Sequence, residues 1–226
     1  LTEEGYYCLL TNCFGQKANQ ESIVKDYLSR GVDGIILCSK SFIEPPDDIC
    51  FININADNPE CDIRIDRISG AYQLTEHLIR QHGHDKVGFV TTATPSNIGK
   101  YHGYRKALED NGCGFFPEMT VEYHDGGTPK QILELINRGV KAWICSNDHL
   151  AIHLINLLTL KGFKVPEDVA VIGFDDSPKA KYVLPGLTTM AQPIQQLARM
   201  TVDELKSRLA RKPPSPPVNL DCKMIL

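Results

Sequence analysis

Two adjacent carboxylates, Asp175 and Asp176, follow a short apolar run and a glycine. The run from Val169 to Ile172 has the composition of a strand covered on both faces, and Gly173 lets the backbone turn after it. An open α/β sheet places its ligand crevice at the carboxyl ends of its strands. The two acids could therefore accept hydrogen bonds from ligand hydroxyl groups, and they could equally cap the next short helix.

A second polar pair, Asn147 and Asp148, follows the apolar stretch 142–146. The amide of Asn147 offers both a donor and an acceptor, which suits a vicinal diol. The alternative is that one of these side chains caps the helix expected to begin here. The residues by themselves leave both interpretations open.

The overall composition excludes several classes of protein. A chain of 226 residues with 42% hydrophobic residues can bury the core of one large domain or two small ones. A net charge of −4 without a long basic run predicts that the chain binds nucleic acid poorly by itself. No apolar stretch reaches membrane-spanning length, and residues 1–4 do not have the pattern of a signal peptide.

Cysteines and histidines show no metal or redox motif. None of the eight cysteines forms a C-x-x-C pair, and we expect free thiols in a reducing compartment, which indicates the cytoplasm. His82 and His84 flank Gly83 in the manner of a helix exit. His149 and His153 have metal-ligand spacing on a helix, but a solvated or dimer-facing helix face is the favoured interpretation. We expect no metal, no cofactor and no catalytic residue, because no Ser-His-Asp order or phosphate loop is found.

Strand-like and helix-like segments alternate along the chain, which predicts an α/β fold with βαβ units and parallel sheets. Strands are expected at 6–10, 34–38, 49–54, 86–90, 119–124, 140–145, 169–173 and 218–225. Helices are expected at 20–30, 69–81, 98–111, 128–138, 148–161 and 193–210. Trp143 lies in the middle of a strand, where core packing is favoured over stacking on a sugar.

Two stretches without periodicity, 91–96 and 187–193, predict crossovers between two lobes with a ligand cleft. The first residues have the pattern of a helix end, and a strand is expected directly after them. A doubly wound lobe normally begins with a strand and a helix before this point, so we expect these two elements of the first lobe to be missing. The predicted N-terminal lobe comprises residues 1–91 and 192–212, and the C-terminal lobe comprises residues 92–191 and 213–226.

The chain resembles the effector-binding domain of the lactose-repressor/galactose-repressor family of bacterial transcription regulators over essentially its whole length. The markers are specific together, in their order and spacing, and each is weak alone. They are Val32 to Leu37, Gly83 to Phe89, Gly103 to Leu108, Ser146-Asn147-Asp148 with Ala151, Val165 to Asp176, and Pro185 to Thr189.

This resemblance implies a fold and a function. The fold would be periplasmic-binding-protein-like type I, with two Rossmann-like lobes of parallel sheets, three crossovers and a small-molecule effector, a sugar or derivative, between the lobes. The protein would be a homodimer that modulates operator DNA binding through a DNA-binding headpiece absent from this chain. The alternative is a solute-binding protein of a sugar transporter with the same fold. Eight cysteines without an evident pairing scheme favour the regulator.

The resemblance also assigns candidate ligand contacts. It implies that Asn147 faces the ligand, with Asp148 as the helix cap, and that Asp175 accepts hydrogen bonds from the ligand, with Asp176 structural. Lys100 stands where most members carry an arginine that clamps the ligand. A lysine cannot reproduce that bidentate grip, and a solvated lysine at a helix start is the alternative.

Further candidates stand at expected strand ends. Asn55 occupies a position where relatives often carry Asp, and Asp125 occupies one that is a stacking aromatic in some relatives. Because Asp125 precedes two glycines, it could equally be a turn residue. The remaining weak candidates are Thr11, Asn12 and Ser39.

Overall fold

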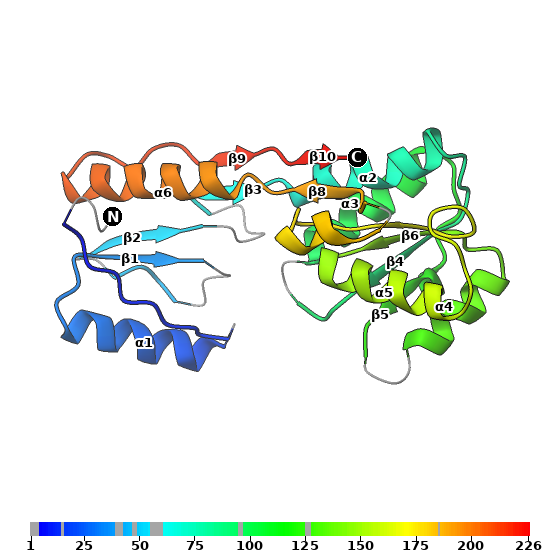
Figure 1. The fold of residues 1–226 in the computed structure, drawn as a ribbon. Helices are drawn as coiled ribbons and strands as arrows, with labels where there is room; N and C mark the ends of the chain where they lie inside the picture. The colour runs from blue at the N-terminus through cyan, green and yellow to red at the C-terminus, as the bar shows by residue number, and fades with distance from the viewer. Residues whose placement is uncertain are drawn as a thin grey trace. The chain divides into compact units, whose positions relative to one another are not determined.

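The chain forms two compact units, each built from two separate stretches of sequence (Figure 1). The computed structural model describes residues 5–14, 16–38, 43–46, 49–54, 61–94, 97–124, 128–184 and 186–226. Unit 1 comprises Leu1–Ile65 and Ile194–Leu220. Unit 2 comprises Asp66–Pro193 and Asp221–Leu226.

The described residues of unit 1 form two pairs of parallel strands and two helices. Strand β1 pairs with β2, and β3 pairs with β9. Helix α6 packs against β2 and β3. The elements are α1 (Lys17–Ser29), β1 (Gly34–Leu37), β2 (Cys50–Asn53), β3 (Ile63–Ile65), α6 (Ile194–Leu209) and β9 (Val218–Leu220).

Unit 2 is built on a parallel sheet of four strands in the order β5-β4-β6-β7, and β8 and β10 form an antiparallel pair. Its helices are α2 (Arg67–Arg80), α3 (Asn97–Asp110), α4 (Thr128–Asn137) and α5 (Asp148–Leu160), with 3₁₀ turns η2 (Pro117–Met119) and η3 (Pro178–Tyr182). Its strands are β4 (Val87–Thr91), β5 (Thr120–Glu122), β6 (Ala142–Cys145), β7 (Ala170–Ile172), β8 (Thr189–Ala191) and β10 (Lys223–Ile225).

The central sheet of unit 2 is covered on both faces. Alternate residues of β6 serve the two sides: Trp143 and Cys145 pack with α4 and α5, whereas Ala142 and Ile144 pack with α2 and α3. This alternation follows from the two-residue period of a strand. Burial on both faces explains why the strands of this sheet are continuous apolar runs in the sequence.

Two glycines in unit 2 permit close packing. A Cβ atom on Gly103 would lie 2.1 Å from the carbonyl oxygen of Ile68, so this glycine lets α3 approach the backbone of α2. A Cβ atom on Gly88 would lie 2.4 Å from the ring of Trp143. The indole is fully buried, which confirms the prediction that Trp143 packs in the core.

The predicted helices all form at their expected places, and the predicted parallel pairing is present in both units. The boundaries between the parts differ from the prediction. Strand β4, expected to close the first lobe, pairs with β5 and β6 of unit 2, so the chain passes from unit 1 to unit 2 between Ile65 and Asp66. It returns between Pro193 and Ile194, and it enters unit 2 again between Leu220 and Asp221.

Three local predictions also need correction. Residues Tyr6–Leu10 form no strand in the described part of the chain, and Leu10 is fully solvent-exposed there. The stretch 187–193, expected to be a bare junction, contains β8. The single strand expected at 218–225 is two short strands, β9 and β10, with partners in different units.

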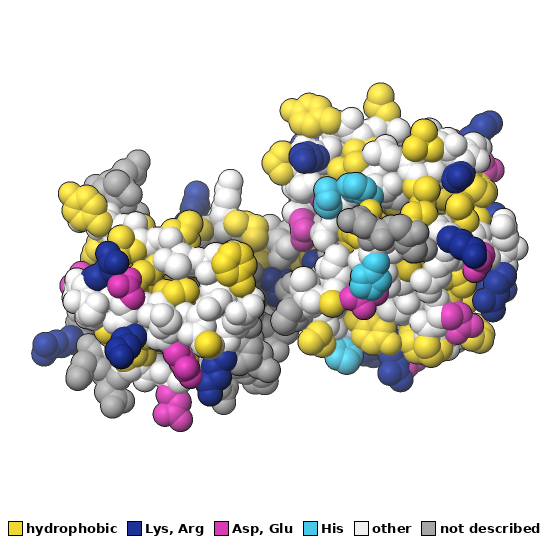
Figure 2. All heavy atoms as spheres, turned by 90° about the horizontal axis from the view of Figure 1, so that it is seen from below, with side chains coloured by type: hydrophobic (Ala, Val, Ile, Leu, Met, Phe, Trp, Pro, Cys, Tyr) yellow, Lys and Arg dark blue, Asp and Glu magenta, His cyan; other side chains and the backbone are white. Residues whose placement is uncertain are grey.

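Surface charges are mixed. On the face drawn in Figure 2, Lys and Arg side chains are scattered among acidic ones, and histidine side chains gather on the larger unit. In the described ranges no helix is both long enough and apolar enough to cross a membrane.

Candidate ligand-binding site

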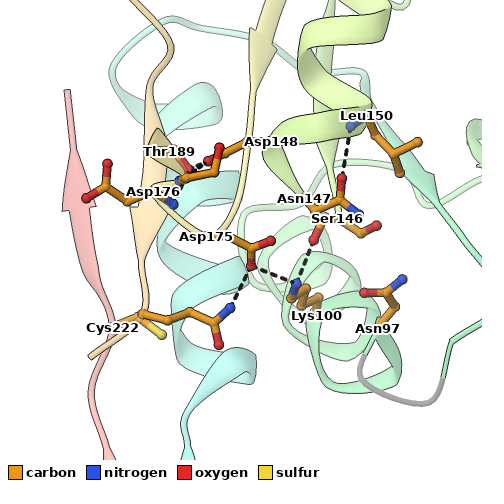
Figure 3. Close-up of polar contacts among 12 residues, drawn as sticks. Asn97, Lys100, Ser146, Asn147, Asp148, Leu150, Asp175, Asp176, Thr189 and Cys222 are labelled. Atoms are coloured by element: carbon orange, nitrogen blue, oxygen red, sulfur yellow. Dashed lines mark hydrogen bonds and ion pairs between the residues drawn. The ribbon is translucent and has the colours of Figure 1, made fainter. Parts of the chain in front are cut away.

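Lys100 carries a buried ammonium group in the first turn of α3. Its side chain is only 5% exposed, and its Nζ donates to the carbonyl oxygen of Ser146 at 2.6 Å. The same Nζ lies 3.6 Å from Oδ1 of Asp175 (Figure 3). It also lies 4.2 Å from the centre of the Phe174 ring. The ammonium is therefore held by a carbonyl, a carboxylate and an aromatic face. The alternative of a solvated lysine at the helix start is wrong.

Asp175 follows β7 and keeps 36% of its side-chain surface exposed. Its backbone N–H donates to the carbonyl oxygen of Met190 at 2.9 Å, and Nε2 of Gln192 donates to its Oδ1 at 2.6 Å. Its φ angle of 118° lies in the region that favours glycine, and Asp176 follows with a φ of 52°. Such strained backbone persists where the surroundings enforce it, and it concentrates at functional sites.

The helix α5 is capped by Asn147 and not, as predicted, by Asp148. Asn147 is the N-cap, because its Oδ1 accepts a hydrogen bond from the N–H of Leu150 at 2.9 Å. Asp148 is buried, and its two oxygens accept from Oγ1 of Thr189 at 2.5 Å and from the N–H of Ser177 at 2.6 Å. The assignment of Asp148 as the cap is therefore wrong. The cap uses only the oxygen of the Asn147 amide, and its Nδ2 can donate to a ligand.

Asp148 ties three segments together beside the Asp175 loop. Burial raises the pKa of its carboxyl group, and the hydrogen bonds from Thr189 and Ser177 oppose that shift. A Cβ atom on Gly173 would lie 2.2 Å from Oδ1 of Asp148. The glycine before the carboxylate pair thus makes room for a buried side chain, in addition to letting the chain turn.

Two polar atoms around Lys100 and Asp175 have no hydrogen-bond partner within the described part of the chain. They are Oγ of Ser146 and Oε1 of Gln192, both buried. Unpaired buried polar atoms are rare in native structures, so their presence next to a partly open carboxylate marks this region as unusual. Gln192 was not predicted as a site residue, because the stretch 187–193 was predicted as a crossover. The short strand β8 brings its side chain next to Asp175.

The other predicted contacts are not brought into this group. Asn12 belongs to unit 1, where its Oδ1 accepts a hydrogen bond from the N–H of Phe14 at 2.8 Å. Thr11, also in unit 1, shares a hydrogen bond with the hydroxyl group of Tyr27. Ser39, Asn55 and Asp125 lie outside the described residues.

The chemistry of the group is that of a binding site. Lys100 and Asp175 compensate each other's charge, while the exposed part of the Asp175 carboxylate offers a charged acceptor and Asn147 offers an amide donor. Charged acceptors make stronger hydrogen bonds than neutral ones. The arrangement therefore suits a neutral ligand with several hydroxyl or N–H groups.

Comparison with known proteins identifies the family of the chain. Residues 75–226 match the family profile of the periplasmic binding protein-like domain. The chain is 27% identical over 226 residues to the HTH-type transcriptional repressor PurR of Aliivibrio salmonicida, covering 93% of this chain and 68% of that protein. It thus spans about two thirds of the length of this relative.

Solved structures of regulators share the fold. A sugar-binding transcriptional regulator of the LacI family from Escherichia coli, complexed with phosphate, superposes with a TM-score of 0.81 at 23% identity, covering 100% of this chain and 86% of that one. The complex of the transcriptional regulator CelR with cellobiose gives a TM-score of 0.79 at 21% identity, covering 93% and 70%.

These matches fix the class of the protein. The repressor relatives confirm that the chain is not an enzyme, as the sequence predicted. The predicted fold, a periplasmic-binding-protein-like α/β fold with parallel sheets, is confirmed as well. The chain belongs to the periplasmic binding protein-like domain family, as the ligand-binding domain of a transcription regulator of the lactose-repressor/galactose-repressor type.

Proposed function

We propose that this domain binds a small-molecule effector, a sugar or sugar derivative, and that Asp175 and Asn147 contact it in unit 2. The observation that carries the proposal is the state of Asp175. Gln192 and Lys100 hold its Oδ1 in place, while more than a third of the side chain stays open. A carboxylate that is fixed before the ligand arrives loses little conformational freedom on binding.

Lys100 has a supporting role in this proposal. Its ammonium is already bonded to the carbonyl oxygen of Ser146, so it orients Asp175 instead of clamping the ligand from outside. The remaining predicted contacts, Asn12, Ser39, Asn55 and Asp125, stay part of the proposal as further ligand residues. The sugar class draws support from the structural neighbours named as sugar-binding and as a cellobiose complex.

The effector would act on a larger protein. We propose that the domain is part of a cytoplasmic homodimer and that ligand binding shifts the operator affinity of a DNA-binding headpiece outside this chain. Exposed apolar side chains on unit 2 support the dimer. Tyr182, the last residue of η3, is 86% exposed, and Leu184, just after it, is 91% exposed. The turn η3 packs against α5. Sedimentation at micromolar concentration tests this point, and a monomer would contradict it.

A thermal-shift screen against sugars, sugar phosphates, nucleosides and purine bases tests the ligand. A ligand at one hundred times its dissociation constant adds about 2.7 kcal/mol of stability. Asp175→Asn should then weaken binding of the hit by about tenfold or more, because a hydrogen bond to a charged group contributes about 1.5–3 kcal/mol.

Asp176→Asn is the matched control, because it removes the neighbouring charge from the same loop. It should leave the dissociation constant unchanged. Equal affinity in wild type and Asp175→Asn, measured by calorimetry on proteins with unchanged circular dichroism, would remove Asp175 from the site. A hit among nucleosides alone would replace the sugar as the effector class.

A further inference from the structure

A pair of histidine rings meets at the C-terminal end of α2, in a group of residues that the Asp175 site does not use. Nε2 of His77 and Nε2 of His82 are 3.1 Å apart. The ring centres lie 4.8 Å apart, and the ring planes are inclined by 77°. The two nitrogens share a hydrogen bond, so one carries the proton and the other accepts it with its lone pair.

The backbone fixes this pair. Helix α2 ends with hydrogen bonds from the N–H groups of Gln81, Gly83 and His84 to the carbonyl oxygens of three residues in its last turns, at 3.0, 3.0 and 3.2 Å. Gly83 has a φ of 70°, which lets the chain reverse at the helix end. His82 is therefore held over His77 by a hydrogen-bonded helix ending.

The spacing of the nitrogens fits a metal ion. A Zn²⁺–imidazole bond is about 2.0–2.1 Å long, so two such bonds to one tetrahedral or octahedral ion place the nitrogens about 3.0–3.4 Å apart. The observed 3.1 Å lies in this interval. A bound ion would replace the hydrogen bond between the rings, and the donor ring would then carry its proton on Nδ1.

The position on the helix favours a cation. The last turn of a helix carries partial negative charge, whereas the first turn carries partial positive charge. The other close histidine pair, His149 and His153, has ring centres 4.5 Å apart, but it stands in the opening turns of α5, just after the N-cap. The dipole of that helix opposes a cation there, so the α2 pair is the better site.

We propose that His77 and His82 bind a divalent transition-metal ion of the kind that prefers imidazole, such as Zn²⁺ or Ni²⁺, with water completing the coordination. This departs from the sequence expectation, which took His82 and His84 only as a helix exit. The ring centre of His84 lies 6.5 Å from that of His82, too far to share the ion in this conformation. Among the described residues no set of three His, Cys, Asp or Glu side chains is arranged around a common ion, so the site has two protein ligands.

Calorimetric titration of the whole chain with Ni²⁺ tests this site, with His77→Gln and His82→Gln as variants. Either substitution should weaken the strongest Ni²⁺ binding by more than about tenfold, because losing even an outer partner of a metal ligand costs about that much. His149→Gln is the matched control and should leave that binding unchanged. Comparison with these variants separates the site from any binding by cysteine thiols.

Histidine ring NMR spectra give a second readout. Substoichiometric Ni²⁺ is paramagnetic and should broaden the ring signals of His77 and His82 before those of His149 and His153. The proposal is overturned if both α2 variants bind Ni²⁺ as tightly as wild type, or if the signals of His149 and His153 broaden first.

Discussion

Arg208 in unit 1 and Lys100 in unit 2 are two cations with little solvent exposure, and they are held very differently. In unit 1, the Arg208 side chain is 14% exposed and donates to Oε1 of Glu204 at 2.6 Å, to the carbonyl oxygen of Phe51 at 2.7 Å, and to Oδ1 of Asp62. Three partners from α6, β2 and the start of β3 thus use the three nitrogens of the guanidinium fork.

In unit 2, the partners of the Lys100 ammonium include the carbonyl oxygen of Ser146, the Asp175 carboxylate at 3.6 Å and the Phe174 ring. The carboxylate is partly open, and nearby polar atoms have no hydrogen-bond partner among the described residues. This difference in hydrogen bonding distinguishes a structural ion-pair network around Arg208 from the proposed ligand-binding site around Lys100. Each guanidinium nitrogen of Arg208 has a protein partner, whereas Oγ of Ser146 and Oε1 of Gln192 near Lys100 have none among the described residues. An unpaired buried polar atom carries a local cost that a ligand can offset.

Arg208→Met should give the largest effect. The substitution leaves the carboxylates of Asp62 and Glu204 without their cation. Breaking a fully buried ion pair costs about 3–5 kcal/mol, and this group is partly buried, so the loss should approach the lower end of that range. Urea denaturation should show this loss in the free energy of unfolding.

Lys100→Met is the contrasting variant. Asp175 can be hydrated once the ammonium is gone, so the main loss is the donor to the Ser146 carbonyl, about 1–3 kcal/mol. If Arg208→Met and Lys100→Met lowered the free energy of unfolding equally, the distinction between a structural ion-pair network and a ligand-binding site would not hold.

Asp148 should make the stability of unit 2 depend on pH. Because burial raises the pKa of its carboxyl group above the ordinary 3.8, the folded state binds this proton more tightly than the unfolded state. The resulting stability is fully present below about pH 3.8 and is lost as the pH rises through the raised pKa. Each unit of elevation is worth about 1.4 kcal/mol.

Asp148→Asn isolates this contribution, because an amide does not titrate. The free energy of unfolding of wild type minus that of Asp148→Asn should increase as the pH falls from 7 towards 4. A difference that is flat over this range would contradict the raised pKa. Arg208 variants should show no such slope from this carboxyl group.

The smallest expected effect concerns strained backbone in unit 1. Arg211 follows α6 with a φ of 58°, and its N–H and that of Lys212 close the helix end with bonds to Arg208 and Ser207. This is the position where helices prefer glycine. Arg211→Gly should therefore raise the free energy of unfolding by about 1 kcal/mol, measured by urea denaturation. A loss of stability would show that the Arg211 side chain contributes more than its backbone costs.

Sequence periodicity was sufficient for the helices, because an amphipathic or apolar repeat is a local property. It could not assign β4 to its unit, since the partners of a strand are chosen by residues far along the chain: Val87 to Val90 pair with Ala142 to Cys145. The strands β3 and β8 have three residues each, too short for a period to be recognised.

The candidate site shows the same limit. The type and position of Asp175 suggest ligand chemistry, and Lys100 is a candidate through the family resemblance; the structure brings the two together. The cap of α5 was predicted at Asp148 and lies at Asn147, because either residue can cap a helix. What decides between them is Thr189, a hydrogen-bond partner 41 residues away. Gln192 had no local signal, since its role depends on the position of β8.

Trp143, the indole buried against Gly88, is the only tryptophan of the chain. Its fluorescence therefore reports the unfolding of unit 2 alone, while circular dichroism follows the helices of both units. The two optical signals, recorded in one denaturation experiment, compare the parts without any label or engineered probe. Coincident curves would mean that the units unfold as one cooperative system, and separated curves would give each unit its own stability.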